Sequence, residues 1–161
     1  YLESELFNSG IRPAINAGLS VSRVGAAAQT KAMKSVAGGL RIQLAQYREL
    51  ATFAQFGTAD LDEATRSQLA RGQRAVEILK QDQNQPLSVA DQVIVMYALS
   101  NGYLDDVEVE KIQATEELLR SFMQSSHAEI ISSINDSGEL SDDGSKNLNK
   151  ALEEFKKTIV G

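Results

Sequence analysis

Arg23 is the residue of this chain best placed by its neighbours to contact a phosphate. It lies in the run Ser20-Val21-Ser22-Arg23-Val24-Gly25, where two serines and a glycine leave room around the guanidinium group. A guanidinium presents five N–H donors in a planar fork that matches the oxygen pairs of a phosphate. The alternative is an ordinary surface arginine that pairs with a nearby carboxylate.

The rest of the chain lacks the groups that would hold a nucleoside triphosphate by its phosphates. The sequence has no G-x-x-x-x-G-K-[ST] phosphate loop. A triphosphate contacted by Arg23 must therefore be held chiefly by another part of the protein or by another subunit. The chain also has no cysteine and only one histidine, His127, which excludes a thiolate metal site, a cysteine nucleophile and an ordinary zinc site.

Composition indicates a globular protein with a mostly aliphatic core and an uneven charge. The net charge is −6, but residues 1–57 carry six Lys and Arg against three acids, and residues 58–161 carry ten against nineteen. The acidic remainder argues against nucleic acid or an anionic membrane surface as a partner, although an ordinary solvated surface explains many of these acids equally well. The longest apolar run, Val93 to Leu99, is far shorter than the roughly 20 residues that span a bilayer. The first residue is not methionine, which suggests a piece of a longer protein.

Most of the chain has the periodicity of helices, and these helices must position any site. Residues 1–25 are punctuated by glycines and contain the β-compatible Leu19, Val21 and Val24, whereas a helical pattern begins at Ala26. We expect Gly38-Gly39 to kink or break this first helix, and Gly57 to end it. Asp60 is the expected N-cap of the next helix and Ser88 that of a central, buried one. The expected later helices are 61–80, 89–100, 111–125, 127–134 and 146–159, with loops at 136–138 and 141–144.

The residues from Leu6 to Gln29, including Gly10-Ile11-Arg12-Pro13 and the Arg23 run, resemble the alpha subunit of F-type ATP synthases. The resemblance continues through several further strings and covers about the first two thirds of the chain; beyond about Ile112 only the helical character and length match. That subunit is about three times longer, so the resemblance places Tyr1 near the end of its nucleotide-binding domain. The further strings are Lys31-Ala32-Met33-Lys34, Leu44-Ala45-Gln46-Tyr47-Arg48-Glu49, Phe53-Ala54-Gln55-Phe56-Gly57, Leu79-Lys80-Gln81 and Gly102-Tyr103-Leu104-Asp105.

The resemblance implies a mainly α fold: a C-terminal helical bundle domain, residues 26–161, preceded by a short β-containing tail of the nucleotide-binding domain, residues 1–25. It also implies a regulatory, noncatalytic role in a proton- or sodium-translocating synthase. The implied partners are beta subunits in an alternating alpha-beta hexamer, the central-stalk gamma subunit and the peripheral stalk. The complex would be peripheral to a bacterial plasma membrane on its cytoplasmic side, or to the equivalent face of a thylakoid or mitochondrial inner membrane.

The same resemblance assigns roles to four residues. Arg23 corresponds to the arginine finger that alpha supplies to the catalytic site on beta, while Arg12, Gln81 and Gln83 correspond to residues beside the adenine of the noncatalytic nucleotide. A glutamine amide both donates and accepts hydrogen bonds, as the edge of adenine requires, and a guanidinium can stack on its face. The cofactor implied is ATP or ADP with Mg²⁺, whose phosphate and metal ligands lie outside this chain. Without the resemblance, Gln81 and Gln83 are simply a polar loop ahead of Pro86.

Two further features have competing explanations. The acids of the bend 102–110 either face the basic central stalk, as the resemblance implies, or include helix caps at Asp105 and Asp106. Phe53 and Phe56 are expected to be core or interface anchors.

The alternatives for the whole chain are the noncatalytic subunit of a vacuolar or archaeal rotary ATPase, and a stand-alone helical adaptor in which Arg23 is dispensable. As a fragment of the synthase, the chain alone is not expected to hydrolyse or make ATP, because it lacks the phosphate loop and the catalytic acid.

Overall fold

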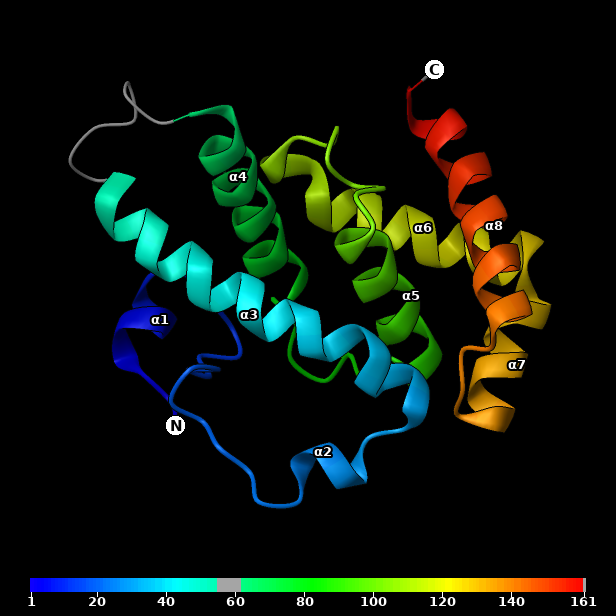
Figure 1. Cartoon of the computed structure of the whole chain (residues 1–161), viewed down its shortest axis with the longest axis horizontal. Coiled ribbons are helices and arrows are strands. Elements are labelled where there is room, and N and C mark those ends of the chain that lie inside the picture. Colours follow the sequence, from blue (N-terminus) through cyan, green and yellow to red (C-terminus); the bar gives the residue numbers. More distant parts are fainter. Residues whose placement is uncertain (55–61, 161) are drawn as a thin grey trace.

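The computed structural model describes residues 1–54 and 62–160, and these fold into a bundle of helices (Figure 1). The predicted mainly α fold is confirmed, and in the described residues the β-content of the tail is reduced to one isolated antiparallel bridge between Leu2 and Ile15. The helices are α1 (Ser4–Asn8), α2 (Gly25–Ala28), α3 (Lys31–Ala54), α4 (Glu63–Ile78), α5 (Val89–Ser100), a 3₁₀ turn η1 (Val109–Lys111), α6 (Ile112–Ser126), α7 (Ala128–Ser137) and α8 (Asp142–Val160).

Helix α5 forms the centre of the core, as its sequence predicts. A helix that is apolar on all sides belongs in an interior, and α5 packs against α3, α4, α6 and α7. It begins where predicted, because the Ser88 hydroxyl accepts a hydrogen bond from the Asp91 N–H at 3.1 Å. The buried apolar residues of α5 are Ala90, Val93, Ile94, Val95, Ala98 and Leu99.

Helix α3 runs without interruption through Gly38 and Gly39, so the predicted break is wrong. Each glycine in a helix interior costs about 1 kcal/mol relative to alanine, too little to outweigh tertiary packing. Val36 and Leu40, on either side of the pair, are buried in the core. These anchors hold the two glycines in the helix.

Two helix starts also differ from those predicted. Asp60 lies outside the described residues, and so do Gly57 and Phe56; the N-cap of α4 is Asp62, whose side chain accepts from the Thr65 N–H at 2.7 Å. Helix α8 begins at Asp142, inside the segment predicted to be a loop. There the Ser141 hydroxyl accepts from the Gly144 N–H at 3.0 Å. Asp142 and Asp143 lie in the first turn, where negative charge favours a helix.

Helices α3 and α4 approach closely at Gly72. A Cβ atom at this position would lie 2.4 Å from the Cβ of Tyr47, and Gly72 itself is buried. Ala75, one turn further along α4, is fully buried too. Small residues on α4 therefore set how closely the two helices pack.

Helix α8 is joined to the core by a polar contact as well as by apolar packing. The hydroxyls of Tyr97 and Tyr103 both donate to Asn149 Oδ1, at 2.9 and 3.0 Å, beside the buried Leu148 and Leu152. Burial is the main cause that raises the pKa of Tyr103, so its hydroxyl remains a donor at neutral pH. The contact fixes α8 against α5 and the turn that follows it.

Replacing Asn149 by alanine is expected to lower the free energy of unfolding by about 1–3 kcal/mol, because two partly buried hydroxyls lose their acceptor. Thermal unfolding of the 161-residue chain measures this loss. The matched control is Asn147→Ala, two residues earlier and exposed on α8. Equal melting temperatures for the Asn149 variant and this control would contradict the role given to the contact.

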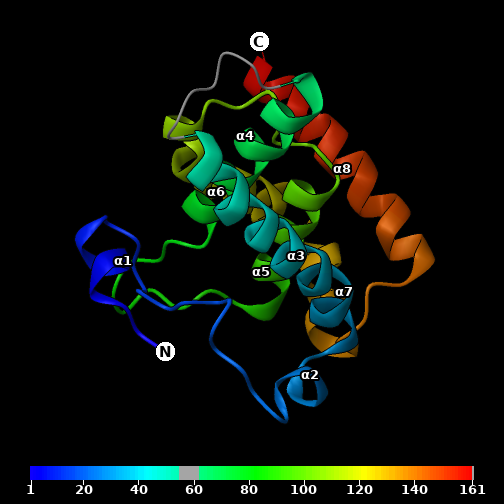
Figure 2. The ribbon, with the colours of Figure 1, turned by 60° about the vertical axis from the view of Figure 1, so that its left-hand side comes forward.

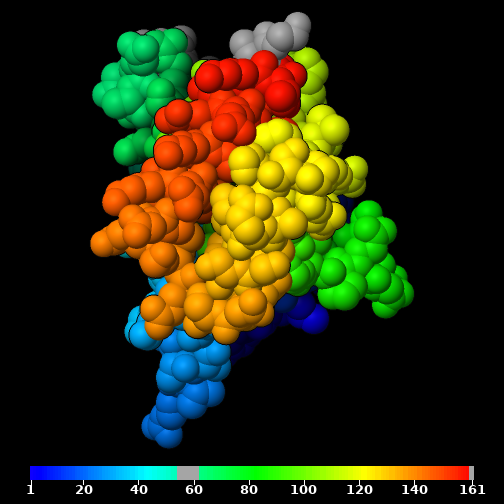
Figure 3. All heavy atoms as spheres, turned by 90° about the vertical axis from the view of Figure 1, so that its right-hand side faces the viewer, coloured from blue at the N-terminus to red at the C-terminus, as the bar shows by residue number. Residues whose placement is uncertain are grey.

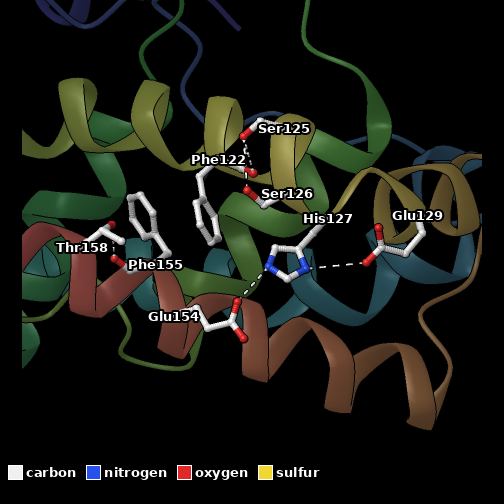
Figure 4. A network of polar contacts seen from close by, with 8 residues as sticks. All are labelled: Phe122, Ser125, Ser126, His127, Glu129, Glu154, Phe155 and Thr158. Atoms are coloured by element: carbon white, nitrogen blue, oxygen red, sulfur yellow. Dashed lines mark hydrogen bonds and ion pairs between the residues drawn. The ribbon is translucent and has the colours of Figure 1, made fainter.

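His127 forms the junction between α6 and α7, and Figure 4 shows its ring between side chains of three helices. Its Nε2 lies 3.1 Å from Glu154 Oε2, and its Nδ1 lies 3.6 Å from Glu129 Oε1. The ring packs against Phe122, which in turn packs against Phe155. The only histidine of the sequence therefore has a structural setting at a helix start.

Within residues 1–54 and 62–160, every helix is too short or too polar to cross a membrane. In the same ranges, no three side chains of histidine, aspartate or glutamate come together as a possible metal site.

Candidate functional site

The N-terminal tail folds back on itself and is joined to α3. The Glu3 N–H donates to the Ala14 carbonyl at 3.0 Å, and the Asn16 N–H donates to the Tyr1 carbonyl at 2.9 Å. Asn16 Oδ1 then accepts from Arg48 Nη1 of α3 at 2.8 Å. This arrangement places the first sixteen residues beside the helical domain (Figure 2).

The tail brings Arg12 to Gln81, the pair that sequence analysis assigns to one site. The Gln81 N–H donates to the Arg12 carbonyl at 2.8 Å, and the Gln81 side-chain amide donates to the Gln85 carbonyl at 2.7 Å. The Arg12 guanidinium carbon lies 4.3 Å from the centre of the Phe7 ring. A guanidinium held over one aromatic ring can also contact a second ring. The Gln81 side-chain oxygen remains available as an acceptor.

Arg12 and Gln81 line a cavity of about 230 Å³ at the meeting of the tail, the α4–α5 connector and α6. Three cations and three carboxylates surround it, so their formal charges cancel, and three glutamines offer both donors and acceptors. Such a lining suits a neutral heteroaromatic ring better than a triphosphate. The lining residues are Gly10, Arg12, Lys80, Gln81, Asp82, Gln85, Leu87, Gln113, Glu116, Glu117 and Arg120.

Gln83 and Arg23 lie apart from this cavity. Gln83 is exposed on the connector and is not among the cavity residues. Arg23 is exposed in the turn that precedes α2, and the segment around it projects from the body of the molecule (Figure 3). A Cβ atom at Gly25 would lie 2.9 Å from the Cβ of Ser22, so the turn that presents Arg23 depends on glycine there.

Glu116 and Arg120 of α6 also line the cavity, although neither is among the site residues expected from the sequence. The Glu116 side chain is only 9% exposed, and its Oε1 lies 3.5 Å from Arg120 Nε. Burial raises the pKa of the Glu116 carboxyl, and Arg120 opposes that shift. Glu116 lies one turn after Ile112 and three residues before Leu119, on the buried face of α6. A charged residue on the apolar face of a helix was the signal that could have revealed it.

The acids of the bend at 102–110 are mostly paired within the chain. Asp105 accepts two hydrogen bonds from the Arg71 guanidinium, one of them from Nε at 3.0 Å. Asp106 lies 2.5 Å from Lys156 Nζ, and Glu108 lies 2.6 Å from Lys111 Nζ. These lysines lower the pKa values of Asp106 and Glu108, chiefly through hydrogen bonds. The bend therefore has a structural role in the domain, and its contact with a stalk stays a prediction.

The fold and the cavity define a class of protein: an α-helical domain with an extended tail, which share a cavity lined by balanced charges and glutamines. Comparison with known families identifies it further. Residues 29–155 match the family described as "ATP synthase alpha/beta chain, C terminal domain", and the chain belongs to that family.

Curated relatives agree with this assignment. The chain is 58% identical over 160 residues to a protein named ATP synthase subunit alpha from Thiobacillus denitrificans, covering 99% of this chain and 31% of the relative. It is 56% identical over 158 residues to the protein of the same name from Idiomarina loihiensis, covering 98% and 31%. It is 54% identical over 160 residues to the protein of the same name from Dehalococcoides mccartyi, and the match covers 99% of this chain and 32% of the relative. The chain thus spans about a third of the length of these relatives.

Proposed function

We propose that this chain is the C-terminal part of the regulatory, noncatalytic alpha subunit of an F-type ATP synthase, a complex that couples ATP synthesis to proton or sodium transport. The observation that carries the proposal is the 54–58% identity, over nearly the whole chain, to proteins named ATP synthase subunit alpha. The complex is the enzyme, and the chain alone is inactive. Extending the sequence upstream tests this: a phosphate loop there supports it, and a start codon directly before Tyr1 contradicts it.

In this proposal Arg23 is supplied to the catalytic site of a neighbouring beta subunit in an alternating hexamer. Its exposed position in a projecting turn suits a residue that acts on another subunit (Figure 3). An arginine at such a place stabilises the charge that spreads over the phosphoryl oxygens in the transition state. The hexamer surrounds a central-stalk gamma subunit and contacts a peripheral stalk, and it meets the membrane only through the rest of the complex.

The exposed apolar side chains of the tail support a larger subunit. Seven of them, all within residues 1–24, are between 48% and 79% exposed. Apolar side chains grouped in this way usually mark a surface that another part of a protein covers. In the proposal this part is the upstream nucleotide-binding domain, which also supplies the phosphate and Mg²⁺ ligands. The seven residues are Tyr1, Leu2, Phe7, Ile15, Leu19, Val21 and Val24.

The cavity holds the base of the nucleotide that alpha itself binds, with Mg²⁺ on the phosphates elsewhere. Arg12 stacks on the base, and Gln81 meets its edge. Gln83, which the resemblance places near the same base, reaches it only if the exposed connector rearranges when the rest of the site is present. No nucleic acid takes part.

Arg12→Ala and Gln81→Ala are each expected to weaken MgATP binding to the full-length subunit about three- to tenfold, because each removes one contact worth about 1 kcal/mol. Calorimetric titration of the subunit without beta measures this directly. Gln124→Ala, on the exposed side of α6, is the control and should bind as wild type does. Unchanged affinity in both cavity variants would contradict the assignment of the cavity.

A further inference from the structure

We propose that Glu116 and Arg120 read the edge of the base in this cavity: Glu116 accepts a hydrogen bond from an amino group of the base, and Arg120 donates to the ring nitrogen beside it. The inference rests on the proposed function of the cavity and adds two specificity-determining residues to it. Both side chains come from α6, on the side opposite the tail that carries Arg12.

The two side chains have hydrogen-bonding capacity that the described part of the chain does not use. The 3.5 Å between Glu116 Oε1 and Arg120 Nε is too long for a good hydrogen bond. Arg120 Nε is buried and has no hydrogen-bond partner among the described residues. Buried polar groups are nearly always partnered in folded proteins. Both residues line the cavity, so a carboxylate acceptor and a guanidinium donor lie side by side at its wall.

This pair has the polarity that adenine requires. One edge of adenine presents the N6 amino donor next to the N7 acceptor, whereas the same edge of guanine presents two acceptors, O6 and N7. A carboxylate next to a guanidinium complements the first pattern. It opposes the second, because the Glu116 oxygens would face the O6 atom of guanine. The pair therefore favours adenine nucleotides over guanine nucleotides.

The buried Glu116 carboxyl also contributes to stability in a pH-dependent way. Because burial raises its pKa, the folded state binds more protons than the unfolded state above the ordinary pKa of glutamate. The contribution of Glu116 to the free energy of unfolding therefore falls as the pH rises through its raised pKa. The ionised carboxylate opposes folding at neutral pH. The charged groups around it are Arg120 and Glu117 of α6, Lys80 and Asp82 of the connector, and Arg12 of the tail.

The test is titration of the full-length subunit with MgATP and MgGTP. Glu116→Met removes the acceptor at similar volume and is expected to weaken MgATP binding about tenfold and MgGTP binding less, which narrows the preference for ATP. Its melting temperature should equal or exceed that of the wild type. Glu116→Gln keeps a neutral acceptor, so it should recover part of the MgATP affinity. Wild-type binding is expected to weaken at acid pH, where Glu116 takes up a proton, and this pH dependence should be absent in Glu116→Gln. Gln124→Met, exposed on the same helix but outside the cavity, should bind within about twofold of wild type.

Unchanged MgATP affinity and ATP preference in Glu116→Met would overturn the inference. Arg120→Gln provides a second route if the methionine variant fails to fold: it should also weaken MgATP binding, and unchanged binding would overturn the role of the pair. If Arg12→Ala and Gln81→Ala weaken binding but the α6 variants do not, only this inference fails. If the wild-type subunit binds no nucleotide, or none of these variants changes its binding, the proposed function of the cavity fails with it.

Discussion

Arg23→Ala, in the full-length subunit assembled with its beta and gamma partners, is expected to lower ATP turnover about a thousandfold, while nucleotide binding changes little. The reason is that a finger arginine contacts charge that develops only in the transition state, so its loss affects the rate far more than the ground-state affinity. Turnover and bound nucleotide are measured on the same reconstituted samples. Arg23→Lys should be almost as inactive, because an ammonium group cannot reproduce the planar fork.

Arg41→Ala is the matched control, since Arg41 is also exposed but lies within helix α3. Its turnover should stay close to that of the wild type. Normal multisite turnover in Arg23→Ala would remove this residue from the mechanism.

The second large effect is expected at Gly72, where α4 meets α3. Gly72→Ala should lower the free energy of unfolding by about 1–3 kcal/mol, because the added methyl group would overlap Tyr47 and push the two helices apart. The melting temperature of the 161-residue chain should therefore fall by several degrees.

Gly38→Ala provides a control with the opposite expected sign. A Cβ atom at Gly38 would meet nothing within 4 Å, so alanine there should stabilise helix α3 by up to about 1 kcal/mol. Both variants make the same chemical change in a helix interior. A Gly72→Ala variant as stable as Gly38→Ala would contradict the close crossing of α3 and α4.

The sequence predicts the helices well where local signals and burial agree. Helix α5 is correct at both ends, because Ser88 caps its start and the apolar run between the ends is buried. The signals fail where packing or a second cap competes with them. Gly38 and Gly39 stay helical because the core holds the residues around them, and α8 starts early because Ser141 caps it ahead of two acids.

The candidate site is harder to derive, because its parts are distant in the sequence. Spacing alone cannot pair Arg12 with Gln81; the resemblance suggested that pair, and the hydrogen bond between their backbones brings them together. Glu116 was readable in principle, as a carboxylate on the apolar face of α6. The role of Arg23 stays a prediction, since its proposed target lies on another subunit.

The most direct test of this account is the mass of the assembly that the full-length subunit forms when it is mixed with a matching beta subunit and MgATP, measured by native mass spectrometry. The account predicts a hexamer that contains both subunits in equal number. A subunit that stays monomeric beside beta, or that binds only unrelated proteins, would contradict it.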